Sequence, residues 1–340
     1  MNKYLGEGQG RQGVNGKFDV VTFGEAMIRL SPPRPTRLEQ ATSLDVNVGG
    51  SELNVAFDVS RLGLRSSWVS KLPDSHLGRR IAGVAKEQGV DTSHVIWSAE
   101  GRAGLYFLEF GVPPRATTVT YDRKNSAMTS LKPGEVDWEF LEGAKVFHVS
   151  GITPALSESC RKSTFEAVRE ARNRGCKISL DMNYRSKLWS LERAERTLGR
   201  LAEMVDIVIA SDAGLVWGIK GDNEEVLRGV KQRFNVETVA MMVRQDDGTM
   251  KGTCGGMALT DRVYTSKRLY GMEIFDRLGS GDSFAAGLIY GYLKSDMQMA
   301  VEWGAAMAAL KHTIPGDTSY VTKEEVEELI RTGGRHGIQR

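Results

Sequence analysis

The most restrictive feature of the sequence is a repeated order in which an apolar segment of strand length precedes a segment with helical periodicity. The segment "FDVVTFG", which starts at Phe18, precedes "SELNVAFDVSRLG", and the order recurs in "AKVFHVSG" with "SESCRKSTFEAVREARNRG" and in "CKISLDMN" with "LERAERTLGRLAEM". Strands that alternate with helices build a parallel sheet with helices on both faces. The sequence therefore predicts an α/β fold with a doubly wound, mainly parallel sheet. In the first of these helices, Ser51 is the expected N-cap and Gly63 the expected end.

Two segments interrupt this order. Residues 29–47 and 101–125 alternate like strands, contain prolines and several arginines, and hold no helical segment. They predict a small β-sheet that projects from the main sheet as a lid. The remaining helices are expected near the end of the chain, over residues 280–294, 297–311 and 322–332.

These segments suggest one domain with short tails. Residues 1–17 are rich in glycine and polar side chains, so we expect a flexible tail there. The domain is expected over residues 18–332, with the lid insertions near 29–47 and 101–125, and residues 333–340 would form a second tail.

The composition excludes several classes of partner. Lys and Arg total 45 and Asp and Glu total 43, so the net charge of +2 gives no reason to expect binding to nucleic acid or membranes. The three cysteines, Cys160, Cys176 and Cys254, form no CxxC pair, so neither a zinc site nor a disulfide framework is predicted. No apolar run reaches the roughly 18 residues of a membrane span, and the N-terminus has no hydrophobic signal core. We expect a soluble, cytoplasmic protein with small-molecule partners.

The stretch "DRLGSGDSFAAG" is the strongest functional signal. It sets Gly279, Ser280 and Gly281 before Asp282 at the start of an apolar helix. Small residues at a helix start let backbone amides approach an anion closely. Asp282 could simply cap the helix, or it could take a proton from a group that attacks a bound phosphate. The motif alone leaves both roles open.

Several motifs together resemble the ribokinase-like (PfkB) carbohydrate kinases, most closely the 2-keto-3-deoxygluconate kinases. These motifs are "GGSELNVA" from Gly49, "GLYFLEFG" with "YDRKNSA", "DMNYRSKLW" and "DRLGSGDSFAAG", and the resemblance covers about residues 18–332. It implies a ribokinase-like fold in which Asp282 is the catalytic base and the preceding amides form an anion hole. It also implies substrate contacts from Gly49, Gly50, Asn54, Tyr106, Tyr121, Arg123, Arg185, Asp282 and Asp317. For Asp317, a turn-forming role is the simpler alternative.

The resemblance also implies cofactors. It suggests ATP and Mg²⁺, with a monovalent cation as a further candidate, and leaves the metal-binding residues unknown. The nucleotide contacts would come from Asn183, Ser211, Arg244, Gly248, Gly279 and Gly281. Three motifs depart from the family pattern, because "SDAG" stands in place of Asn-x-x-Glu, "VRQDDGTM" keeps a single glycine, and Arg277 replaces a threonine. These departures concern the binding of magnesium and nucleotide.

Arginines favour an acidic substrate. The guanidinium fork of Arg matches a carboxylate, and Arg123 and Arg185 occupy the segments that resemble sugar-acid kinases. We therefore expect ATP-dependent phosphorylation of a sugar acid at a primary hydroxyl, with 2-keto-3-deoxygluconate 6-phosphate as the product. The alternatives are a kinase of a neutral ketose or nucleoside, and a sugar-binding protein of this fold with little catalysis. A homodimer formed through the lid is expected, because open sheet edges are often covered by a second copy.

Overall fold

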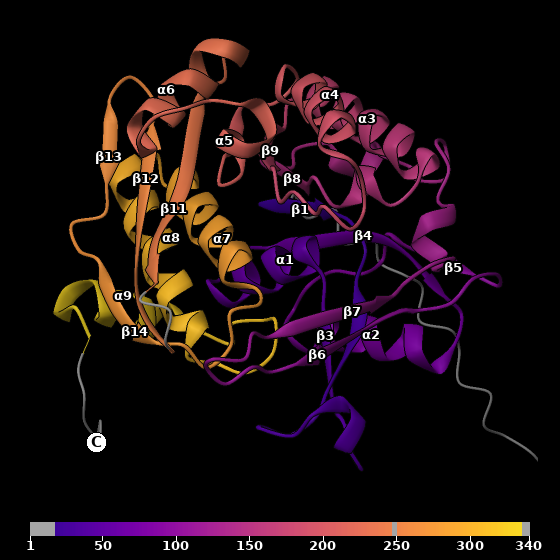
Figure 1. Cartoon of the computed structure of the whole chain (residues 1–340). Coiled ribbons are helices and arrows are strands. Elements are labelled where there is room, and N and C mark those ends of the chain that lie inside the picture. Colours follow the sequence, from indigo (N-terminus) through magenta and orange to yellow (C-terminus); the bar gives the residue numbers. More distant parts are fainter. Residues whose placement is uncertain (1–17, 247–249, 335–340) are drawn as a thin grey trace, which may run out of the picture.

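The computed structural model describes residues 18–246 and 250–334 (Figure 1). The main sheet has ten strands in the order β13-β12-β11-β10-β9-β8-β1-β4-β5, with β14 paired to β12. Its strands are β1 (Val20–Phe23), β4 (Ser66–Pro73), β5 (Val95–Ser98), β8 (Val146–Ser150), β9 (Lys177–Asp181), β10 (Ile207–Ile209), β11 (Thr238–Asp246), β12 (Lys251–Leu259), β13 (Val263–Thr265) and β14 (Tyr270–Glu273). Pairing is parallel from β5 to β11 and antiparallel from β11 to β14. The predicted mainly parallel sheet is confirmed.

Helices cover both faces of this sheet (Figure 1). They are α1 (Ser51–Arg61), α2 (His76–Glu87), α3 (Glu158–Asn173), α4 (Leu191–Ala202), α5 (Ala213–Trp217), α6 (Asn223–Phe234), α7 (Ser280–Leu293), α8 (Met297–His312) and α9 (Lys323–Thr332). Four short 3₁₀ segments complete the described elements: η1 (Leu38–Gln40), η2 (Ala127–Ser130), η3 (Glu139–Leu141) and η4 (Thr153–Ala155). The last three helices begin and end within one residue of the expected positions.

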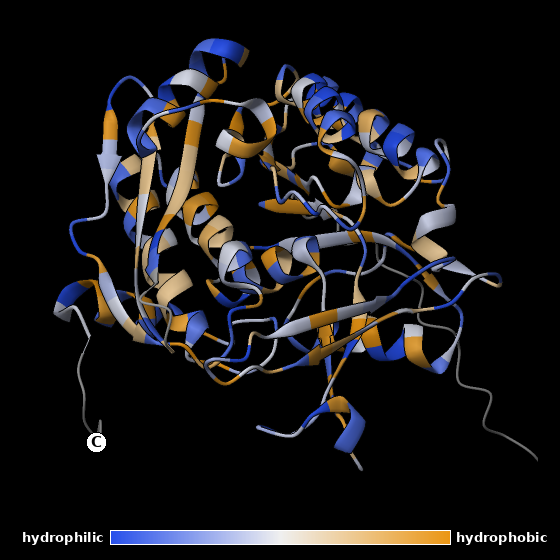
Figure 2. Ribbon diagram, viewed as in Figure 1, coloured by the Kyte–Doolittle hydropathy of each residue, from blue (hydrophilic) through white to orange (hydrophobic). Residues whose placement is uncertain are grey.

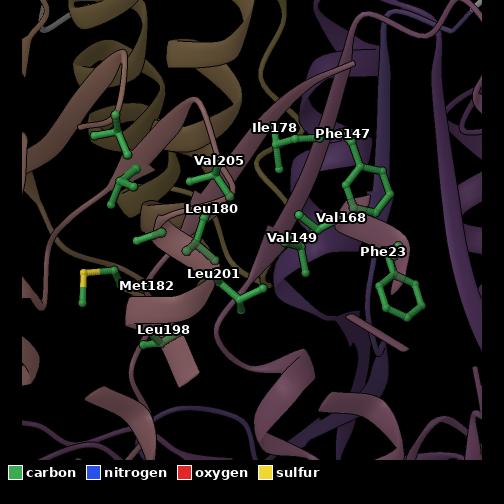
Figure 3. Packing of buried hydrophobic residues seen from close by; sticks show 14 of the residues in the cluster. Phe23, Phe147, Val149, Val168, Ile178, Leu180, Met182, Leu198, Leu201 and Val205 are labelled. Carbon is green, nitrogen blue, oxygen red and sulfur yellow. The ribbon is translucent and has the colours of Figure 1, made fainter. Parts of the chain in front are cut away.

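The strands have apolar side chains on both faces because each face is buried. Val21 and Phe147 belong to a core with α3, α4 and α6, whereas the adjacent Val20 and Val146 pack with α1, α7 and α8. Figure 3 shows Leu180 of β9 beside Leu201 of α4 in the first of these cores. Apolar colour in Figure 2 follows the buried strands and α7, and the outer faces of α3 and α4 are polar. Such two-sided burial is typical of parallel sheets.

A separate sheet of four strands lies where the lid was expected. Its order is β3-β2-β6-β7, built from β2 (Met27–Ser31), β3 (Asp45–Gly49), β6 (Gly104–Glu109) and β7 (Thr118–Asp122). The strands β2 and β6 pair in parallel, whereas β3 and β7 pair antiparallel to their neighbours. The sheet lies beside the N-terminal end of α1 (Figure 1).

The sequence predicted the end of α1 correctly but not its N-cap. Gly63 follows the helix with φ of +84°, as expected of a glycine that ends it. The prediction that Ser51 caps the helix is wrong: Gly50 occupies the N-cap, and the Ser51 hydroxyl is bonded to Asp282 instead.

The expected tail at 1–17 and most of the tail at 333–340 lie outside the described residues. Over the described ranges, no helix is long and apolar enough to cross a membrane.

Candidate active site

A cleft of about 690 Å³ lies between the carboxyl ends of the parallel strands and the small sheet. Ligands of open α/β sheets bind at this edge. The cleft is lined by every described residue that the sequence placed in a site: Gly49, Gly50, Asn54, Tyr106, Tyr121, Arg123, Asn183, Arg185, Ser211, Arg244, Gly279, Ser280, Gly281, Asp282 and Asp317. Gly248, the remaining candidate, lies outside the described residues.

Asp282 lies in the first turn of α7, and its carboxylate is held by another helix. Ser51 Oγ donates to Oδ1 over 2.6 Å and Asn54 Nδ2 donates to Oδ2 over 2.7 Å, both from α1. No side chain caps α7, so the capping alternative has no support here. Burial raises the pKa of Asp282, and the hydrogen bonds from Ser51 and Asn54 oppose that rise. The result is a buried, oriented carboxylate at the wall of a cleft.

The turn before Asp282 depends on Gly279. This residue is the N-cap of α7 with φ of +81°, and a Cβ built on it would lie 1.7 Å from the carbonyl oxygen of Asp317. A side chain is therefore excluded by the backbone conformation and by the neighbouring loop. The close approach brings the start of α7, a helix N-terminus whose first amides have no partner within the helix itself, to the cleft. Such amides can stabilise an anion.

A second carboxylate extends this arrangement. Asn183, with φ of +37°, donates from Nδ2 to Ser51 Oγ over 3.0 Å and from its backbone N–H to Asp181 Oδ1 over 3.2 Å. Burial raises the pKa of Asp181 well above its ordinary value, and the negative charges of Asp282 and Asp212 raise it further. Sequence reasoning missed Asp181 as a site residue, although its place at the end of β9 was the available signal.

Arg123 is already paired with a carboxylate. It donates from Nη2 to Glu25, which also accepts a hydrogen bond from Ser126 Oγ. Glu25 is buried and lies two residues after the end of β1 in the stretch "FGEAM". Sequence reasoning did not identify Glu25, because only the fold brings its carboxylate to Arg123. Arg123 is thus part of an ion pair at the wall of the cleft.

The environment of Arg185 differs from that of Arg123, whose guanidinium is paired with Glu25. Arg185 is exposed at the cleft and, among the residues that the structure describes, its guanidinium makes no hydrogen bond or ion pair. Its charge lowers the pKa values of Asp181 and Asp282, which places the guanidinium within electrostatic reach of both carboxylates. Tyr121 lies across from Tyr106 with ring centroids 5.9 Å apart. This part of the cleft offers a cation and aromatic surface.

Asp317 is held by residues of the small sheet. Arg29 of β2 donates to Asp317 Oδ1 over 2.8 Å and to Asp276 Oδ2 over 2.6 Å, and the Tyr106 hydroxyl donates to Asp317 Oδ2. A Cβ on Gly49 would lie 2.5 Å from the Asp317 carboxyl group, so glycine is required there for space. Asp317 therefore does more than form a turn, because it joins the small sheet to the loop after α8.

The described residues contain no compact group of three His, Cys, Asp or Glu side chains that could hold a metal ion. Asp212 lies beside Ser211 at the cleft, and Asp212 Oδ2 accepts a hydrogen bond from the backbone N–H of Tyr184 over 2.9 Å. The charges of Asp282 and Asp212 both raise the pKa of Asp181, so Asp181 lies within electrostatic reach of both carboxylates. A cation here would take few of its ligands from the protein.

Comparison with known proteins supports the expectations from the motifs. The model of the pfkB family carbohydrate kinases matches residues 17–324. A 2-dehydro-3-deoxygalactonokinase of Haloferax volcanii is 39% identical, over 95% of this chain and 99% of its own length. A 2-dehydro-3-deoxygluconokinase of Bacillus subtilis is 32% identical, with coverage of 92% and 96%. The crystal structure of a 2-dehydro-3-deoxygluconokinase from Thermotoga maritima has a TM-score of 0.89 and 38% identity, with coverage of 93% and 99%.

Proposed function

The chain belongs to the pfkB family of carbohydrate kinases, and on this basis we propose that it phosphorylates a sugar acid at a primary hydroxyl, with ATP as the donor. The substrate is 2-keto-3-deoxygluconate, also called 2-dehydro-3-deoxygluconate, and the product is its 6-phosphate. The relatives carry names of kinases that act on 2-dehydro-3-deoxy sugar acids. The observation that carries the proposal is the cleft that combines the buried carboxylate of Asp282 with the exposed guanidinium of Arg185.

Asp282 acts as the general base. Its carboxylate accepts the proton of the sugar hydroxyl as the oxygen attacks the γ-phosphorus, and the bond to the ADP oxygen breaks. A raised pKa makes the carboxylate a stronger base than an ordinary Asp, while Ser51 and Asn54 fix its orientation. Asn54 therefore serves the base in addition to any contact with a sugar hydroxyl.

The turn of Gly279, Ser280 and Gly281 holds the transferring phosphoryl group. Backbone amides at the start of α7 donate to its oxygens, and the helix dipole favours negative charge at that end. The nucleotide extends from this turn along Asn183, Ser211 and Arg244, which line the same cleft. Gly248 belongs to this set as a candidate from the sequence alone.

Magnesium fits the carboxylates at this end of the cleft. Burial is the main cause of the raised pKa of Asp181, and the negative charges of Asp282 and Asp212 raise it further, so a divalent cation would relieve that repulsion. When bound, Mg²⁺ supplies charge neutralisation to the phosphate oxygens. Because the described part of the chain has no cluster of three ligands, most of the coordination would come from phosphates and water.

The substrate carboxylate is bound by Arg185. A guanidinium that faces the cleft without a protein partner among the described residues is available to an anion, whereas the Arg123 guanidinium is engaged with Glu25. Arg123 also lines the cleft, so the substrate contact that the resemblance implied stays a candidate, although its Nε is buried and has no hydrogen-bond partner among the described residues. Tyr106 and Tyr121 complete the sugar side of the cleft.

The small sheet acts as a lid and joins two copies. Exclusion of water by a lid limits wasteful hydrolysis of ATP.

The edge strands β3 and β7 of this sheet carry exposed apolar side chains, Val46 and Tyr121. We place a homodimer contact at β3, so Val46→Lys should shift the mass measured by light scattering from dimer to monomer. The control Leu215→Lys changes an exposed leucine on α5 and should leave the mass unchanged.

The protein is assigned to the cytoplasm, where ATP is available and the three buried cysteines stay reduced.

A coupled ADP-release screen over sugar acids, neutral sugars and nucleosides tests the function. The expected result is the highest kcat/KM for 2-keto-3-deoxygluconate or its galacto isomer. Higher activity on ribose, fructose or adenosine would overturn the substrate, and no ADP release with any compound would overturn the catalytic function.

A further inference from the structure

Lys311 is a fully buried lysine that the mechanism above does not use. It occupies the last turn of α8, and none of its surface is exposed. Its Nζ donates to the carbonyl oxygen of Ile314 over 3.0 Å and to that of Asp276 over 3.5 Å. A lysine is rarely buried in this way, because the loss of hydration is costly unless polar groups replace the water.

The ammonium lies where two functional loops meet. Backbone N–H groups of Phe275 and Asp276 donate to the carbonyl oxygen of His312, so the segment before the phosphate turn is docked on the end of α8. Asp276 Oδ2 also accepts from the backbone N–H of Gly316 over 3.0 Å. Lys311 therefore joins the segment that leads into Gly279 and Asp282 to the loop that carries Asp317.

Three carboxylates lie within electrostatic reach of this ammonium. Burial lowers the pKa of Lys311 and the charge of Arg29 lowers it further, whereas the carboxylates of Asp276, Asp317 and Asp58 oppose that change. The C-terminal end of a helix, where Lys311 lies, also favours a cation. The charge of Arg29 is already committed to Asp276 and Asp317 through its two ion pairs.

Backbone carbonyl oxygens gathered around one point are also what K⁺ binds in proteins. Here the ammonium of Lys311 occupies the point between the two carbonyls, so the residues present do not fit the monovalent cation that the family resemblance suggested. Resting on the proposed kinase function, we propose that Lys311 is a positioning residue that replaces a monovalent cation and makes the enzyme independent of K⁺ and Na⁺. Its covalently attached charge holds the phosphate-binding turn against the loop after α8.

The wild-type enzyme gives the first test. Turnover and the melting temperature are measured in KCl and in tetramethylammonium chloride at the same ionic strength. We expect turnover to differ by less than about twofold, and the melting temperature by less than about 1 °C. Selective activation or stabilisation by K⁺ beyond these limits would overturn the proposal. The melting measurement needs no sugar, so it remains decisive even if the proposed substrate is wrong.

The variant Lys311→Met gives the second test. Its side chain has similar length without the charge, so turnover in tetramethylammonium chloride should fall about tenfold or more. K⁺ should then restore part of the turnover and raise the melting temperature, a response that the wild type lacks. Equal impairment in both salts, or no impairment, would contradict the proposal. If the variant does not fold, the wild-type comparison decides alone.

A matched control is Lys71→Met. Lys71 is also buried and donates to Glu135 over 2.9 Å, but it does not line the cleft. Removal of its charge should lower the melting temperature equally in both salts. A K⁺-selective response in this control would show that the cation acts on destabilised protein in general and would contradict the specific role of Lys311.

Discussion

Ser51, the first residue of α1, donates a hydrogen bond from its Oγ to Asp282 Oδ1 over 2.6 Å, although 231 positions separate the two residues. The bond joins the "GGSELNVA" motif to the "GSGD" motif. A serine that could have capped its own helix instead orients a carboxylate on another helix. The two motifs therefore form one unit, in which α1 positions the proposed base and α7 supplies the proposed anion hole.

The first prediction concerns this base. Asp282→Asn should lower kcat by about 10²- to 10⁴-fold, the usual contribution of a positioned general base. The amide has nearly the same shape, so a non-hydrolysable ATP analogue and the sugar should still bind, as measured by calorimetry. Near-normal turnover in this variant would rule out Asp282 as the base.

The second prediction concerns the pH dependence of kcat. The base is active when it is ionised, so kcat falls as the pH drops through the pKa of Asp282, which lies above the ordinary value for Asp. Asn54→Ala removes a hydrogen bond that stabilises the charged form, so it should raise that pKa further and move the acidic limb to higher pH. A pH profile of kcat at saturating substrate checks this.

The control for this pH prediction is Thr129→Ala. Thr129 donates to the backbone of Ser126 and has no bond to Asp282. Its acidic limb should coincide with that of the wild type. An unchanged limb in Asn54→Ala, with only a higher KM for the sugar, would return Asn54 to a role in sugar binding alone.

The third prediction concerns stability. Arg29 is 1% exposed, and its guanidinium pairs with Asp276 and Asp317. Arg29→Met leaves two buried carboxylates without their cation, so the free energy of unfolding should fall by about 3 to 5 kcal/mol. Urea denaturation measures the loss. Arg80→Met, at an exposed position on α2, should change the free energy by less than about 0.5 kcal/mol.

Much of the fold could be predicted from local patterns. The alternation of apolar strands and amphipathic helices predicted the parallel sheet, and the two irregular segments predicted a separate small sheet. These features depend on residues close in sequence, where periodicity and turn residues are informative. The position of the cleft agrees with this order, because ligands of open α/β sheets bind where parallel strands end and "DMNYRSKLW" begins at the last residue of β9.

The partners of the site residues could not be predicted in this way. Arg29 lies in a segment with several arginines, a residue type that is mostly exposed, and only the three-dimensional structure brings Asp276 and Asp317 to it. The pairing of Arg123 with Glu25 spans 98 positions and has no local signature. Long-range pairing of this kind depends on the packed arrangement of elements, which a single sequence does not specify residue by residue.

The fourth prediction concerns magnesium. If Asp212 helps to hold the cation, Asp212→Asn should raise the Mg²⁺ concentration at half-maximal activity while leaving the KM for the sugar unchanged. Conversely, Ser211→Asn combined with Gly214→Glu restores the Asn-x-x-Glu pattern and should lower that concentration. Titration of activity with MgCl₂ at fixed ATP measures both. No change in either variant would show that other groups organise the metal.

The last prediction separates the two arginines and decides the substrate class. A charged hydrogen bond to a carboxylate contributes about 1.5 to 3 kcal/mol, so Arg185→Gln should raise the KM for 2-keto-3-deoxygluconate roughly ten- to a hundredfold. Its melting temperature should stay that of the wild type, because no described residue depends on Arg185 as a partner. Weak activity on an uncharged sugar should be nearly unaffected, because that sugar presents no anion to the guanidinium.

Arg123→Gln should behave differently, because it removes the cation beside the buried Glu25. We expect a lower melting temperature together with a higher KM for the sugar acid, and Glu25→Gln combined with Arg123→Gln should recover part of the stability by removing the unpaired charge. A rise in KM that the double variant retains would mean that Arg123 also contacts the substrate. If Arg185→Gln and Arg123→Gln impair acidic and neutral sugars equally, neither arginine recognises the carboxylate, and the assignment to a sugar acid fails while the role of Asp282 stands.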